Sequence, residues 1–179
     1  MSPESLRRLL AVVLLALVPL AVGVAMTRGW RARIARQSGI PAPRSPPGDL
    51  GEPTLTVAGT YVSTTLAGDW LDRVAAHGLG PRAAAVLAVH PAGLLLSRDG
   101  AEPVWIPSAD VTGVGESAGM AGKVPARPEL LVVRWRSGDT ELETGLRPAA
   151  RADRTGITAL AARTAEAVGL PAHHDREVA

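Results

Sequence analysis

Cysteine and phenylalanine are both absent from the 179 residues of the chain. The absence of cysteine excludes disulfides, thiol nucleophiles and cysteine-based zinc sites. One tyrosine and four tryptophans make up the whole aromatic content. The core must therefore rest on valine, leucine, isoleucine and alanine, with tryptophan as the few large side chains.

Positive charge is scarce in the part of the chain that is expected to fold. Residues 1–50 carry seven arginines against Glu4 and Asp49, a net charge of +5. Residues 51–179 carry twelve basic and fifteen acidic groups, a net charge of −3. A nucleic-acid-binding domain concentrates positive charge on the fold itself. We therefore expect no nucleic-acid partner.

A complete phosphate-binding loop is also lacking. The stretch GESAGMAGKV at 115–124 ends in Gly-Lys, but a Walker loop needs glycine five places before that pair and serine or threonine directly after it. Those positions hold Ser117 and Val124. We predict that the chain binds no nucleotide and that this stretch connects two strands. The remaining functional alternative is a partner-binding loop formed by Gly119, Gly122 and Lys123.

No arrangement of side chains in the sequence predicts catalysis. The four histidines, at positions 77, 90, 173 and 174, lack the spacing of metal ligands. Asp69 and Asp72 lie three residues apart, and helix capping and solvation explain this pair better than acid–base chemistry. No serine stands in a nucleophile elbow. We expect no metal, no cofactor and no enzymatic activity.

A hydrophobic run near the N-terminus predicts a membrane span. Leu9 to Met26 contains no charge, and as a helix it covers roughly 27 Å, close to the hydrocarbon thickness of about 30 Å. A cleaved signal peptide or a buried helix are the alternatives. The run is longer than the usual apolar region of a signal peptide, about 7–15 residues. We therefore predict a transmembrane helix at 9–27, behind a short flank at 1–8.

Basic residues follow the hydrophobic run and predict its orientation. Arg7, Arg8 and the terminal amine precede it, whereas a larger cluster of arginines follows it. The positive-inside rule then places the C-terminal side in the cytoplasm. A solvated basic collar and a set of contacts to anionic headgroups are both compatible with this cluster. The candidate headgroup contacts are Arg28, Trp30, Arg31, Arg33 and Arg36.

Proline and glycine dominate the next segment. Residues 39–53 contain five prolines and three glycines, a composition that excludes a helix or a central strand. Residues 28–53 are therefore expected to form a basic and then semi-extended juxtamembrane linker.

Residues 54–168 are expected to form one domain, with a disordered tail at 169–179. Short apolar runs bounded by turn residues predict strands at 54–65, 83–90, 94–98, 104–107, 109–117, 129–137 and 140–146. In the most regular hairpin, Val133 and Trp135 should face the side opposite to Arg134 and Arg136.

Two helices are expected among these strands. The first is predicted at 68–80, with Asp69 as its N-cap and Gly78 as its stop. The second is predicted from about 153 to 168 and carries an apolar stripe. The fold class is mainly β with a C-terminal helix (α+β), as a small barrel or sandwich behind the N-terminal span. This element order is that of a pleckstrin-homology (PH) type fold, but periodicity alone leaves other small β architectures open.

Four segments of the chain resemble a known family. The segments at 60–80, 105–114, 119–124 and 130–147 are similar to actinobacterial membrane-anchored proteins with a bacterial PH-like domain. Gly-Asp-Trp-Leu-Asp-Arg and Ala-Gly-Lys-Val are the most specific parts. Such proteins are often labelled as membrane or export proteins or as transporters. The resemblance implies one N-terminal span and a PH-like barrel, and it supplies no catalytic residues. We expect the span to lie in the bacterial inner membrane.

A binding role follows as the functional expectation. Arg73 and Arg82 stand against Asp69 and Asp72 after the first strand, so a phosphoinositide headgroup finds no cluster of cations there. We expect an adaptor that binds a protein partner near the membrane, for example by adding a strand to an exposed sheet edge. The alternatives are an accessory subunit of a transporter or export system and an enzyme whose site the sequence does not reveal. Trp70, Trp105 and Trp135 are expected in core or rim packing, with a ligand groove as the alternative.

Overall fold

The computed structural model describes residues 3–117 and 129–170. It divides into two compact units, Met1–Ser38 and Gly39–Ala179, and each is described by itself. Within the first unit, the side chains of residues 5, 6, 8–11 and 33 are outside the description. The tail at 171–179 and the loop residues Gly119, Gly122 and Lys123 lie outside the described residues.

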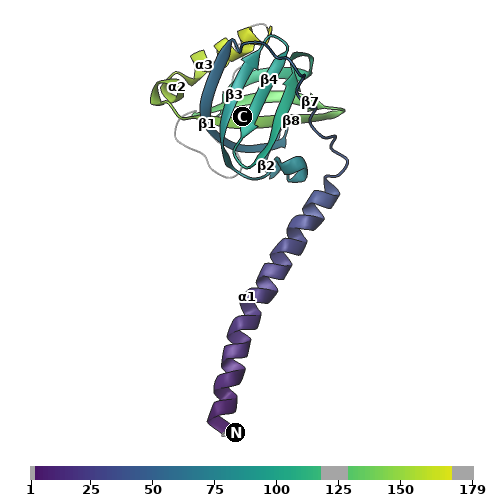
Figure 1. Cartoon of the computed structure of the whole chain (residues 1–179), viewed down its shortest axis with the longest axis vertical. Helices are drawn as coiled ribbons and strands as arrows, with labels where there is room; N and C mark the ends of the chain where they lie inside the picture. Colours follow the sequence, from purple (N-terminus) through teal and green to yellow (C-terminus); the bar gives the residue numbers. More distant parts are fainter. Residues whose placement is uncertain (1–2, 118–128, 171–179) are drawn as a thin grey trace. The chain divides into compact units, whose positions relative to one another are not determined.

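The first unit contains one long helix, α1 (Pro3–Arg36) (Figure 1). Leucine and alanine, both strong helix formers, dominate its sequence, and Pro19 lies inside it. Within Val12–Arg36, an 18-residue window has a mean hydropathy of 2.0, and none of that window is buried. By length and composition, α1 is therefore long and apolar enough to cross a membrane.

The described part of the second unit is built on an antiparallel eight-stranded sheet. Its strands are β1 (Leu55–Leu66), β2 (Asp69–Arg73), β3 (Ala83–His90), β4 (Gly93–Arg98), β5 (Ala101–Pro107), β6 (Val111–Ser117), β7 (Leu130–Ser137) and β8 (Thr140–Pro148). The remaining elements are the 3₁₀ helices η1 (Ala76–Gly78) and η2 (Ser108–Asp110) and the α-helices α2 (Arg151–Thr155) and α3 (Ile157–Ala167).

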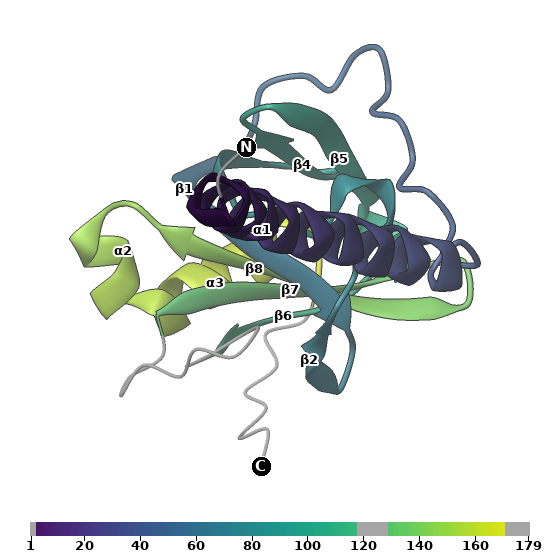
Figure 2. The ribbon, with the colours of Figure 1, turned by 90° about the horizontal axis from the view of Figure 1, so that it is seen from below.

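The strands follow the order β5-β4-β3-β1-β8-β7-β6, and β2 pairs with the end of β1. The long strand β1 is central, because its first half pairs with β3 and its second half with β8. A register shift between Tyr61 and Ser63 breaks the ladder with β8, and such irregularities bend a sheet. In Figure 2 the β4–β5 half and the β6–β7 half lie on opposite sides of the fold.

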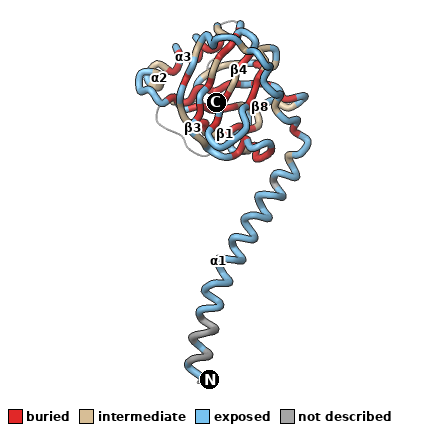
Figure 3. The backbone as a smooth tube through the Cα atoms, viewed as in Figure 1, coloured by how far each residue is buried: buried red, intermediate tan, exposed pale blue. Residues whose placement is uncertain are grey.

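The core lies between these two halves of the sheet. Val133 and Trp135 of β7 are buried, whereas Arg134 and Arg136 are exposed, so the predicted hairpin and its alternation are confirmed. The apolar stripe of α3, with Ile157 and Leu160, is buried in the same cluster. Figure 3 shows the buried positions concentrated in the strands. The expected mainly β fold with a C-terminal helix is confirmed.

The helix predicted at 68–80 is wrong. Residues 69–73 form β2, and only Ala76–Gly78 are helical, as a single 3₁₀ turn. Asp69 Oδ1 accepts the backbone N–H groups of Leu71 (3.0 Å) and Asp72 (3.1 Å). These are the bonds that an N-cap would make, but the chain then pairs with β1 instead of continuing as a helix. Pairing with a neighbouring strand therefore outweighs the local preference.

The helix predicted at 153–168 is divided in two. It begins earlier, at Arg151, and Gly156 separates α2 from α3. Glycine is a weak helix former because it loses the most backbone freedom on ordering.

The segment 39–53 contains neither a helix nor a central strand, but it packs against the sheet. Ile40 is 8% exposed and belongs to the core cluster. The Nε2–H of His77 donates to the Ile40 carbonyl (2.7 Å), and Ser137 Oγ donates to the Pro41 carbonyl (2.9 Å). Further along, a ring nitrogen of His90 donates to the Leu50 carbonyl (3.1 Å). Much of this segment is thus attached to the domain.

Candidate functional site

The sheet has two edges, β5 and β6, and they differ in how far the chain itself covers them. An edge strand presents unpaired N–H and C=O groups that a further strand can use. Strand β5 contains Pro103, which has no N–H to donate. Arg44 forms a β-bridge with Trp105, and its Nη2 lies 3.5 Å from Asp110 Oδ2. The segment 39–53 therefore covers part of the β5 edge.

Strand β6 is the more accessible edge. Among the described residues its only strand partner is β7. Two glycines leave the strand uncrowded: a Cβ at Gly115 would meet nothing within 4 Å, and one at Gly113 would meet only Arg134, at 3.8 Å. Helix α3 lies alongside, and Thr158 Oγ1 donates to Glu116 Oε2 (2.6 Å). The edge of β6 that faces away from β7 is therefore a candidate position for an added strand.

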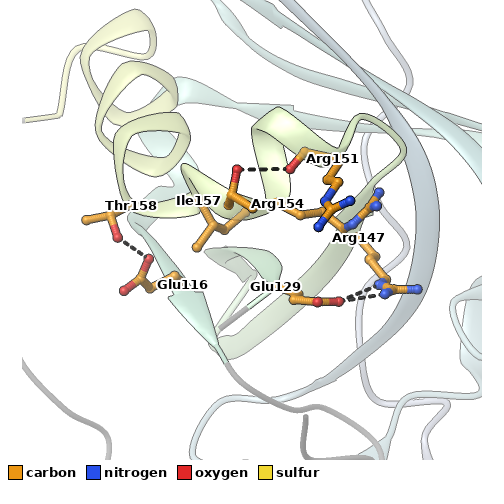
Figure 4. Close-up of a pocket in the computed structure, with 8 residues that line it drawn as sticks. Glu116, Glu129, Arg147, Arg151, Arg154, Ile157 and Thr158 are labelled. Atoms are coloured by element: carbon orange, nitrogen blue, oxygen red, sulfur yellow. Dashed lines mark hydrogen bonds and ion pairs between the residues drawn. The ribbon is translucent and has the colours of Figure 1, made fainter. Parts of the chain in front are cut away.

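A cavity of about 420 Å³ opens at the end of β6 (Figure 4). Strands β6 and β8, the residue before β7, and the helices α2 and α3 contribute to its wall. Figure 4 shows the guanidinium groups gathered on one side and Glu116 with Thr158 on the other. The lining residues are Glu116, Glu129, Arg147, Arg151, Arg154, Thr155, Ile157 and Thr158.

Most of the charged groups in this cavity already have hydrogen-bond partners. Nε and Nη2 of Arg147 donate to Glu129 Oε2 (3.0 and 2.6 Å). Nη1 of Arg154 donates to the carbonyls of Pro148 and Ala149. In the described part of the chain, the Arg151 guanidinium has no hydrogen-bond or ion-pair partner. Arg151 is thus the cation in the cavity that is available to an anionic group of a bound molecule.

The residues predicted as headgroup contacts lie on α1. Arg28, Trp30, Arg31 and Arg36 are exposed there, with Trp30 at 42% exposure, and the side chain of Arg33 is outside the description. Their contact with lipid stays a prediction. The predicted partner-binding loop of Gly119, Gly122 and Lys123 lies outside the described residues, and it also stays a prediction.

The tryptophans of the domain divide between core and surface. Trp105 and Trp135 are 4% and 2% exposed, whereas Trp70 is 42% exposed. The expected packing is thus confirmed for the first two, and Trp70 is a surface residue. His77 and His90 donate to backbone carbonyls, and the described residues contain no group of three histidine or acidic side chains close enough to hold a metal ion.

A polar network that the sequence did not indicate lies inside the core. The Tyr61 hydroxyl donates to the Leu79 carbonyl and contacts Thr64 Oγ1 (2.9 Å). Thr64 in turn contacts Thr144 Oγ1 (2.8 Å), which also accepts the indole N–H of Trp135 (2.9 Å). Burial raises the pKa of the Tyr61 phenol above its ordinary value, against the opposing effects of the hydrogen bond with Thr64 and of nearby arginines. The network attaches the residues after η1 to the sheet and is closed to solvent.

The sequence did not indicate the cavity at the end of β6 either. Arg147, Arg151 and Arg154 are four and three residues apart, and this spacing at the junction of β8 and α2 was a signal for a cationic cluster. Their position in one cavity with Glu116 and Glu129 could not be predicted, because those two residues are distant from them in the sequence.

One comparison with known proteins gives a match. A family model described as "Bacterial PH domain-like" matches residues 40–162. The matched range begins at Ile40, the first buried residue of the packed segment, and includes all eight strands. No curated protein matches the chain.

Proposed function

The chain belongs to the bacterial PH domain-like family, and from this membership we propose that it is a membrane-anchored adaptor that binds a protein partner through the β6 edge. Domains of this kind are generally binding modules without catalysis. The observation that supports the proposal is the contrast between the two sheet edges. Strand β5 is partly covered by the segment 39–53, whereas β6 pairs only with β7 in the described chain.

The proposed binding mode needs both backbone and side-chain contacts. Four backbone hydrogen bonds to an added strand contribute about 2–6 kcal/mol, at roughly 0.5–1.5 kcal/mol each. A micromolar complex requires about 8 kcal/mol, so the added strand alone is too weak. The cavity at the end of β6 supplies further contacts, and Arg151 there fits an acidic side chain of the partner segment.

The anchor is the second part of the proposal. We propose that α1 spans the bacterial inner membrane and that the domain lies on the cytoplasmic side, in agreement with the positive-inside rule. The basic residues at the end of α1 then contact anionic headgroups at about 1 kcal/mol each. A fixed anchor confines the search for a partner to the vicinity of the bilayer, which favours partners that are themselves at the membrane.

Site-specific crosslinking in cells tests the proposed edge. A photoreactive amino acid replaces Thr112, an exposed residue of β6, in the full chain at native expression. The matched control places it at Glu102, an exposed residue of β5. We expect a discrete protein adduct from position 112 and none from position 102. Equal adducts from both positions, or none from position 112, would refute a role for β6.

The identity of the adduct separates the two functional alternatives. A membrane protein with several spans, identified by mass spectrometry, would assign the chain as an accessory subunit of a transporter or export system. A soluble protein or a single-span partner would assign it as an adaptor.

A further inference from the structure

Large apolar side chains are rare on the described surface of the second unit. The three that are exposed are Trp70 at 42%, Leu71 at 60% and Val86 at 40%. A single exposed apolar residue needs no explanation, but adjacent ones indicate a contact surface. Trp70 and Leu71 are neighbours on β2, and neither belongs to the β6 edge or its cavity.

The backbone of β2 holds these two side chains away from the sheet. Strand β2 pairs with β1 at Leu66↔Asp69 and Thr65↔Arg73, so three residues of β2 lie between two successive pairs and the ladder is irregular there. Residues 70–72, here called the β2 turn, are stabilised by the Asp69 carboxylate bonds described above. Both Trp70 and Leu71 are exposed on this turn.

This turn lies at the end of the domain where the chain enters from the N-terminal side. The Ile40 carbonyl is bonded to His77 in η1, which follows β2 closely in the sequence. A Cβ on Gly138, in the β7–β8 turn, would lie 2.9 Å from Pro41. Ala67, between β1 and β2, donates its N–H to the Glu141 carbonyl (3.0 Å).

We propose that Trp70 and Leu71 insert into the interface of the bilayer in which α1 is anchored. The inference rests on the membrane anchor of the proposed function. Three residues lie between Arg36 and Ile40, and the four Cα–Cα steps reach at most about 14 Å when fully extended. The part of α1 beyond the predicted span, residues 28–36, adds about 14 Å, so Ile40 stays within roughly 28 Å of the end of the span. Tryptophan favours the membrane–water interface because its ring is apolar and its N–H is polar.

The charges around the turn indicate how it binds. Asp69 and Asp72 offset Arg73 and Arg82 in this region. Attraction to anionic lipids therefore contributes little, and apolar contact drives the insertion. The depth to which Trp70 and Leu71 insert should accordingly be similar in neutral and anionic bilayers and should change little with salt concentration.

The absence of cysteine makes the proposal directly testable. Single variants Leu71→Cys, Val86→Cys and Val18→Cys of the full chain are labelled with an environment-sensitive fluorophore and reconstituted in phosphatidylcholine nanodiscs. Val86 is the exposed control on β3, and Val18 reports the span of α1. Nitroxide-bearing lipids quench labels inside the bilayer, and aqueous iodide quenches labels outside it.

We expect the label at 71 to be quenched by nitroxide lipids and protected from iodide, with the reverse at 86. Adding Trp70→Ser to the Leu71→Cys variant should lower the lipid quenching. If the labels at 71 and 86 respond alike while the label at 18 is embedded, α1 is an anchor but the proposed insertion is overturned. Trp70 and Leu71 would then be assigned to a contact with a protein. If the label at 18 is also outside the bilayer, the anchor and this proposal both fail.

Discussion

The packed segment before β1 gives the sharpest stability prediction. Ile40 comes from the Pro/Gly-rich region that the sequence predicts to be a spacer, yet its side chain is 8% exposed and lies in the main core cluster. We expect Ile40→Ala to destabilise the whole domain. The hydrogen bonds of His77 and Ser137 to this segment use backbone carbonyls and survive the substitution.

The magnitude follows from the atoms removed. Ile40→Ala deletes three carbons from an almost fully buried side chain, and each buried CH₂ contributes about 0.8 kcal/mol. We therefore expect a loss of about 2–3 kcal/mol in the free energy of unfolding, at the low end of the range of about 2–5 kcal/mol for Ile→Ala in cores. The low end applies because the segment lies at the surface, where its neighbours can relax.

Urea unfolding of the full chain in detergent micelles, followed by tryptophan emission, measures this loss. Trp105 and Trp135 are buried and report the domain. The matched control is Ile34→Ala in α1, where the isoleucine is 37% exposed, and it should change stability by no more than about 0.5 kcal/mol. If Ile40→Ala costs no more than this control, the segment is detached and the account of the covered β5 edge is wrong.

Three further predictions concern the core and the topology. Burial raises the pKa of Tyr61, the only tyrosine, so its phenolate absorbance in the folded chain should appear above pH 10. The free energy of unfolding should then fall as the pH rises past about 10, the pKa of tyrosine in the unfolded chain. Half-ionisation of Tyr61 at pH 10 in the native chain would contradict this. Thr144→Val leaves the Trp135 indole N–H without its acceptor and should cost about 1–3 kcal/mol in urea unfolding, whereas an equal cost for the exposed Thr158→Val would refute the role of the buried network. A reporter enzyme fused after Ala179 should be active in the cytoplasm, and its export would reverse the proposed topology.

The strands were predictable where turn residues bound an apolar run. Strand β3 occupies the predicted residues at both ends, because Pro81 and Pro91 flank an unbroken apolar stretch. The hairpin of β7 and β8 followed from alternation, and its charged residues meet across the strands, with Arg134 Nε 2.6 Å from Glu143 Oε1. Local pattern and tertiary structure agree in these elements.

Strand β2 was missed because its local chemistry fits two structures. Asp69 accepts the same backbone N–H groups that it would accept as a helix N-cap. Strand β1 extends to Leu66 and pairs with residues 69–73, and this pairing favours the strand over the helix. Nothing in residues 68–80 themselves indicates that β1 will lie beside them.

The candidate edge could not be chosen from the sequence for a similar reason. Strands β5 and β6 both have the pattern of short strands, and they differ because Arg44 reaches Trp105 from 61 positions away. The cavity at the end of β6 likewise joins Glu116 to Thr158, 42 residues apart. Contacts at such separations depend on the completed fold.

The central claim of a retained membrane anchor is tested most directly by the mass and location of the mature chain. Cells that express it at native level are fractionated, the membranes are washed with alkaline carbonate, and the intact mass of the product is measured. The account predicts a carbonate-resistant membrane protein of 18.5 kDa that retains its first residues. A freely soluble product that lacks the N-terminal apolar run would contradict it.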